Sequence, residues 1–256
     1  MILKQKLLVL ILILFSLSSP AADIRYYDVE VIIFENLQTD AHNAEHWPQQ
    51  FERKMPESMI ELDGQWPGGR PEEYDPALSF TRLPENEWRL TREAEKIDQS
   101  KSRRLLAHLA WVQPGLPQTQ ALSVHFNLPV MANQETGKSG TDAPGQTSPE
   151  KPATESPVEV GTLDALIRVS LARYLRVETD LLLTLYPPSV EEKTMMADAE
   201  SDNGTETVSS PRYFRVQQVR QRIRSTELHY LDHPVLGMLI MFTQHKTADK
   251  AAAKKK

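Results

Sequence analysis

Two histidines four residues apart are the first side chains in this sequence whose types and spacing could do chemistry. His229 and His233 lie in a segment that also contains Tyr230 and Asp232. On a helix this spacing would place both imidazoles on one face, where they could bind zinc. However, no glutamate directly follows the first histidine, as a zinc protease requires, and a proline directly after the second disfavours a helix. We therefore favour a turn stabilised by Asp232 over a metal site.

The sequence carries no signature of a catalytic nucleophile or of a cofactor site. It has no cysteine, which excludes disulfides, thiolate metal sites and cysteine nucleophiles. A phosphate loop that would end at Gly137-Lys138-Ser139 lacks its first glycine, because Ala132 stands there. The 35 acidic residues offer many carboxylate pairs, but none is singled out for glycan cleavage. His108 lies in an apolar run and is interpreted as a satisfied sheet residue. We expect a protein that is not an enzyme and holds no cofactor or metal.

A series of arginines near the C-terminus is the most suggestive surface feature. If residues 213–224 form a strand, Arg220, Arg222 and Arg224 point to the same face. The protein has a formal net charge of −6. Three guanidinium groups on one face of such a protein could receive carboxylates of a ligand through paired hydrogen bonds. Alternatively, they could pair with the protein's own aspartate and glutamate side chains.

Strand patterns dominate the elements that must position these residues. The pattern at residues 84–102 predicts one helix, with apolar residues spaced among charged ones. Alternating or continuous apolar residues predict six strands, at 26–35, 104–112, 163–169, 173–186, 213–223 and 235–242. One helix and six strands predict an α+β domain built on a mostly antiparallel sheet.

Long polar stretches interrupt this pattern. Residues 131–160 and 189–210 are too polar to bury much surface, so we expect two long disordered insertions. Residues 246–256 form a flexible tail in this interpretation. The rest, residues 22–245, is long enough for a single domain held by its core alone.

The N-terminus has the layout of a signal peptide. Lys4 and Lys6 precede an apolar run from residue 7 to residue 15, and small residues follow. We predict cleavage after Ala21, against the alternative of an uncleaved anchor, for which the run is short. No other segment is apolar enough to span a membrane, so we expect an exported chain, in the periplasm. The acidic composition and this location both argue against nucleic-acid binding.

Three stretches of the chain stand out together, at residues 25–35, residues 109–115 and residues 220–234, the last with Gly237 soon after. Together they resemble the CsiV family of periplasmic peptidoglycan-binding proteins of Gram-negative bacteria. Thr226 stands where glycine is expected from the resemblance, and Val112 where arginine is expected. The resemblance implies a protein without catalytic residues that binds the cell wall and supports its synthesis and cell shape.

Two hypotheses follow. The first is a wall-binding adaptor or regulator of penicillin-binding-protein activation, whose partners would be peptidoglycan and a cell-wall synthase or its lipoprotein activator. The second is a wall-processing hydrolase with an unrecognised active site. The candidate contact residues for wall or partner are Arg220, Arg222, Arg224, Glu227, His229, Tyr230, Asp232 and His233.

Overall fold

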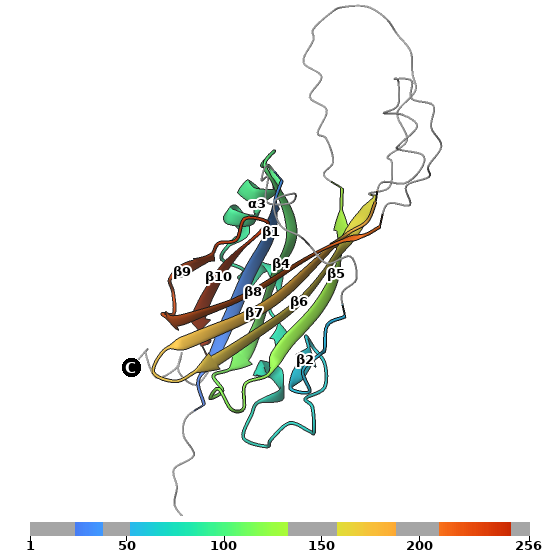
Figure 1. Cartoon of the computed structure of the whole chain (residues 1–256). Coiled ribbons are helices and arrows are strands. Elements are labelled where there is room, and N and C mark those ends of the chain that lie inside the picture. The colour runs from blue at the N-terminus through green and yellow to red at the C-terminus, as the bar shows by residue number, and fades with distance from the viewer. Residues whose placement is uncertain (1–23, 38–51, 133–157, 188–209, 247–256) are drawn as a thin grey trace, which may run out of the picture.

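Two five-stranded sheets form the protein in its computed structural model, which describes residues 24–37, 52–132, 158–187 and 210–246 (Figure 1). Sheet A has the order β3-β4-β1-β10-β9, with β1 (Tyr26–Asn36), β3 (Thr81–Arg82), β4 (Arg103–Pro114), β9 (Leu228–Leu231) and β10 (Leu236–Gln244). Sheet B has the order β2-β5-β6-β7-β8, with β2 (Met59–Glu61), β5 (Ser123–Met131), β6 (Glu159–Leu171), β7 (Leu175–Leu185) and β8 (Arg212–Ile223). Neighbouring strands are antiparallel, except that β2 runs parallel to β5.

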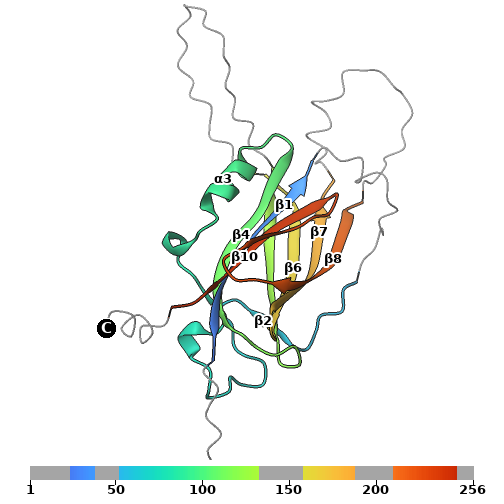
Figure 2. The ribbon, with the colours of Figure 1, turned by 90° about the vertical axis from the view of Figure 1, so that its left-hand side faces the viewer.

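The two sheets pack against each other through one apolar core (Figure 2). Alternation along β6 and β7 explains which residues enter it, since side chains of a strand point to opposite faces in turn. Leu163, Ala165 and Ile167 are buried against the other sheet, as are Leu181 and Leu183. The residues between them face outward and are mostly polar. This pattern gives sheet B one apolar face and one polar face.

Strand β1 is buried on both faces, because a helix covers the outer face of sheet A (Figure 2). The helix α3 (Thr91–Asp98) packs Ala94 and Ile97 on Ile32 and Phe34. Two short 3-10 helices, η1 (Pro76–Leu78) and η2 (Glu85–Glu87), lie in the segment that leads to α3. The continuous apolar run of β1 is therefore explained by a strand that is buried on both faces.

The predicted fold class is confirmed. The described residues form a mostly antiparallel β structure with one α-helix, and residues 104–112 lie in a strand as expected. The helix is shorter than predicted, because only residues 91–98 of the expected 84–102 are α-helical. The prediction of six strands was also wrong, since β2, β3, β5 and β9 were missed.

The predicted bounds of one insertion need correction. Met131 closes β5, while Glu159 and Val160 open β6, so these ends of the expected 131–160 loop are paired strand. Most of both expected insertions, the expected signal peptide and most of the expected tail lie outside the described residues. Within the described ranges no helix is long and apolar enough to cross a membrane.

Candidate functional site

The predicted arginine face does not exist as one strand face. Arg220 lies opposite Val177 on β7, and Ile223 lies opposite Leu175, so three steps along β8 match two along β7. This β-bulge breaks the alternation from which the shared face was inferred. Arg222 has a φ of 58°, in the left-handed region. Arg224 follows the end of β8 and lies 3.7 Å from Glu227 in an exposed ion pair.

The three arginines nevertheless stay at the surface of one short stretch of chain. Arg220, Arg222 and Arg224 are all exposed. Arg220 and Arg222 form no ion pair with any carboxylate among the residues that the structure describes. The alternative in which all three pair internally therefore holds only for Arg224, through an exposed partner. Their use as a contact surface remains a proposal.

The turn between β8 and β9 carries the residue that departs from the expected family pattern. Thr226 has a φ of 68°, which suits glycine and is unfavourable for a β-branched residue. Its backbone N–H donates to the carbonyl of Phe242 at 2.6 Å, so the conformation is fixed by a bond to β10. The glycine expected here would remove the backbone strain.

Strand β9 presents Tyr230, which joins the candidate surface to sheet A. Its ring stacks on Phe34 with centroids 6.2 Å apart, and its hydroxyl donates to Asp232. Burial and the hydrogen bond to Asp232 raise the pKa of Tyr230 to about 12, so the hydroxyl stays protonated. Phe34 in turn packs where Gly237 has no side chain, because an added Cβ would lie 2.3 Å from the ring.

The two histidines of this segment do not converge. His229 lies on β9 opposite Ile240, while His233 follows that strand and accepts a hydrogen bond from the backbone N–H of Val235 at 3.2 Å. No group of three potential ligands for a metal is found among the residues that the structure describes. The turn is instead tied to sheet B, because Gln218 donates to the carbonyl of Asp232 at 2.6 Å.

A buried acid on β1 positions α3 and explains His108. Glu30 is 2% exposed and accepts hydrogen bonds from the backbone N–H groups of Arg89 and Leu90, both at 2.8 Å. His108 Nε2 lies 2.9 Å from the same carboxylate, which confirms His108 as a satisfied sheet residue. Burial alone would raise the pKa of Glu30, but the bonds from His108, Arg89 and Leu90 outweigh it and hold the pKa below 4.5.

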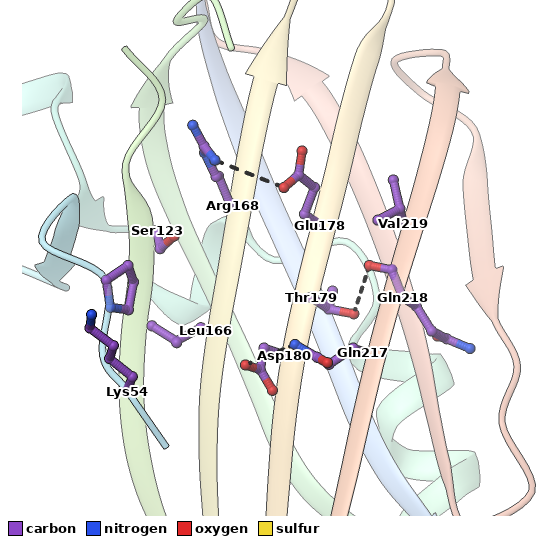
Figure 3. Close-up of a pocket in the computed structure, with 11 residues that line it drawn as sticks. Lys54, Ser123, Leu166, Arg168, Glu178, Thr179, Asp180, Gln217, Gln218 and Val219 are labelled. Carbon is purple, nitrogen blue, oxygen red and sulfur yellow. Dashed lines mark hydrogen bonds and ion pairs between the residues drawn. The ribbon is translucent and has the colours of Figure 1, made fainter. Parts of the chain in front are cut away.

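Sequence analysis missed a groove of about 440 Å³ on the outer face of sheet B (Figure 3). Strand register builds it from two rows that cross the sheet. One row runs through Leu166, Asp180 and Gln217, and the next runs through Ser123, Arg168, Glu178 and Val219. Lys54 and Pro56, from the segment before β2, close the groove at the β5 side, and Thr179 and Gln218 complete its lining.

Ion pairs hold the polar walls of this groove. Arg215 binds both carboxylate oxygens of Asp180, at 2.8 and 2.6 Å, and these bonds raise the pKa of the guanidinium. Glu178 accepts from Arg176 at 2.8 Å and lies 3.9 Å from Arg168 (Figure 3). Bidentate and cross-strand pairs of this kind fix side-chain positions before any ligand arrives.

The signal for this groove was present in the sequence but incomplete. The polar alternation of residues 163–186 gives the outward residues of β6 and β7. It does not give the register between strands, which decides that Arg168 faces Glu178 and that Glu178 faces Val219. The contribution of Lys54 depends on a loop segment that has no periodic pattern at all.

Comparison with known proteins places nearly the whole chain in one family. The family model described as peptidoglycan-binding protein, CsiV, matches residues 6–245. No curated protein and no solved structure gives a match. The match covers both sheets, the groove and the segment with the candidate contact residues. The chain therefore belongs to the CsiV family of peptidoglycan-binding proteins.

Proposed function

We propose that this protein is a non-catalytic peptidoglycan-binding protein of the periplasm that supports cell-wall synthesis and cell shape. It would act as an adaptor or regulator of penicillin-binding-protein activation. The observation that carries the proposal is the family match, which spans residues 6–245 under a description that names peptidoglycan binding. An exported chain, as residues 1–21 predict, would meet peptidoglycan outside the cytoplasm.

An adaptor needs separate surfaces for the wall and for a protein partner, and the chain offers two. The groove lies on the outer face of sheet B. The second surface is formed by the end of β8, the following turn and β9, with the candidate residues Arg220, Arg222, Arg224, Glu227, His229, Tyr230, Asp232 and His233. Exposed arginines there support contacts with carboxylates of the wall or of a protein such as a synthase or its lipoprotein activator.

The test separates binding from catalysis in one experiment. The purified mature protein is incubated with sacculi, the sacculi are pelleted, and the supernatant is analysed for muropeptides. We expect the protein in the pellet and no release of soluble muropeptides above a buffer control. Released muropeptides would instead support the hydrolase hypothesis, and a protein that stays in the supernatant would contradict wall binding.

A further inference from the structure

The segment before β2 is fastened to the outer face of sheet B, and this fixes one end of the groove. The side chain of Arg53 is 4% exposed. Its guanidinium pairs with Asp164 on β6 and donates to the carbonyl oxygen of Asp180 on β7 at 3.1 Å. His125 on β5 contacts Asp164 at 2.8 Å and also pairs with Glu61. Arg53 is held by two strands, so the backbone of its neighbour Lys54 is fixed at the edge of the groove.

The carboxylates that line the groove are already compensated by arginines outside its lining. The lining itself is balanced, with Lys54 and Arg168 beside Glu178 and Asp180. Glu178 is bound by Arg176, and Asp180 by Arg215. The charges of Lys54 and Arg168 are therefore left for an anionic ligand, on a chain whose formal net charge is −6.

Lys54 and Arg168 each keep a nitrogen for a ligand, because no hydrogen bond within the described residues occupies the ammonium of Lys54 or Nη1 of Arg168. Lys54 is exposed and pairs with no carboxylate of the described chain. Arg168 is held by the carbonyl oxygens of Gln118 and Ala121, at 2.6 and 3.2 Å, while its remaining nitrogen lies 3.9 Å from Glu178. A guanidinium fixed by two carbonyl oxygens and an exposed ammonium in one groove are suited to carboxylate groups.

The rest of the lining distinguishes a peptide from a sugar chain. None of the eleven lining residues is aromatic, so the described part of the chain offers no ring in this groove on which a sugar could stack. Leu166 lies between Lys54 and Asp180, and the side chain of Val219 stands at the far side (Figure 3). Val219 is 56% exposed, which leaves an apolar contact open for a small side chain such as a methyl group.

We propose that this groove binds the carboxylate-bearing stem peptide of peptidoglycan, with Lys54 and Arg168 receiving carboxylates and the exposed Val219 contacting an alanine methyl group. The choice of ligand rests on the proposed function, whereas the site and its preference for carboxylates rest on the groove itself. The glycan chain then gains affinity only through the peptides that it carries.

The test uses two soluble probes, a stem tetrapeptide and peptide-free glycan chains, titrated into the full-length mature protein. We expect the tetrapeptide to bind and the glycan chains not to bind. Lys54→Glu should weaken tetrapeptide binding by about tenfold or more, because it replaces attraction by repulsion at the groove's edge. The control is Lys96→Glu, which makes the same change at an exposed position of α3, on the opposite side of the protein, and should leave affinity unchanged. Thermal melts check that both variants fold.

The outcomes separate this inference from the proposed function. A protein that pellets with sacculi and binds glycan chains, but not the tetrapeptide, overturns the inference and leaves wall binding intact. Equal loss of affinity in Lys54→Glu and Lys96→Glu, or loss in neither, also overturns it. Tetrapeptide binding that depends on Lys54, in a protein that does not pellet with sacculi, supports the groove and contradicts the proposed function.

Discussion

The outer faces of the two sheets carry similar acidic residues, but one pair of carboxylates is covered by other parts of the chain and the other pair is partly open to solvent. On sheet A, Asp28 and Glu30 of β1 point outward, and on sheet B, Glu178 and Asp180 of β7 do the same. The segment that leads into α3 covers the first pair, which is 5% and 2% exposed. The second pair lines an open groove. The same kind of strand thus produces a structural site on one face and a candidate binding site on the other.

The partners of these carboxylates explain the difference. Glu30 is bound by two backbone N–H groups at the start of α3 and by His108, so its charge holds a helix in place. The residue before that helix is Leu90, whose side chain cannot cap it, and Glu30 instead fixes the approach to the helix by accepting from the backbone N–H groups of Arg89 and Leu90. Glu178 and Asp180 are bound by arginine side chains, which leave the surface above them open to a ligand.

The largest expected effect comes from Glu30→Gln. This change removes the charge that accepts three hydrogen bonds in a buried site, so we expect a loss of about 3 kcal/mol in the free energy of unfolding. The same substitution on sheet B, Glu178→Gln, should cost about 1 kcal/mol or less, because that ion pair is partly solvated. Urea unfolding of both variants measures the contrast. Equal losses of unfolding free energy in the two variants would contradict the difference between a buried structural carboxylate on sheet A and a partly solvated one on sheet B.

The pH dependence of stability sharpens the same contrast. The folded-state pKa of Glu30 lies below its ordinary value of 4.5. Its stabilising contribution is therefore present above pH 4.5 and is lost as the pH falls through the lower, folded-state pKa. The parent should lose stability on acidification below about pH 4.5, and Glu30→Gln should lose less over the same window. Urea midpoints at a series of pH values check this, and parallel curves for the two proteins would contradict it.

Much of the fold could be predicted from local patterns, and the exceptions have physical causes. Strands β1, β4, β6, β7, β8 and β10 have strong apolar patterns and were predicted. The short strands β2 and β3 have two or three residues and exist only because a neighbouring strand pairs with them. The helix was overextended at its start, since Glu30 fixes the first helical turn from a distance of 60 residues.

The candidate site was harder to predict, because register and bulges are not local. The eight named residues of the C-terminal segment stay a prediction, and the structure does not give Arg220 and Arg222 the common strand face that was expected. A single inserted residue in β8 shifts the parity of every side chain after it. The groove depends on the register of four strands and on Arg53, which no periodicity marks.

A smaller effect, in the opposite direction, is expected where the chain passes from sheet B to sheet A. Thr226→Gly should stabilise the protein by about 1 kcal/mol, because a β-branched residue is strained at a φ of 68° and glycine is not. The side chain is exposed, so little packing is lost. Ser225→Gly is the control, since that residue is not among those with a positive φ, and it should give no gain. Thermal or urea unfolding measures the stability of both variants, and a Thr226→Gly variant less stable than the parent would contradict backbone strain at Thr226.

The smallest effect on stability should come from replacing Arg220, Arg222 and Arg224 together by glutamine. The three side chains are exposed, and within the described part of the chain they form one ion pair, Arg224 with Glu227, of a kind that contributes about 0–1 kcal/mol. If the segment is a contact surface, the triple variant should melt within a few degrees of the parent and bind its target more weakly. Binding by the parent should also fall with added salt, because exposed charges are screened over about 8–10 Å at moderate ionic strength.

Combining this triple variant with Lys54→Glu tests which surface binds the wall and which binds a protein partner. If both surfaces bind the wall, sacculus pelleting should weaken in each variant and further in the combination. If the arginines bind a protein partner, the triple variant should pellet like the parent but lose capture of that partner from envelope extracts. A large fall in melting temperature for the triple variant would make the arginines structural. If binding depends neither on salt nor on the triple substitution, the three arginines are not contact residues. The groove on sheet B would then be the remaining candidate binding site.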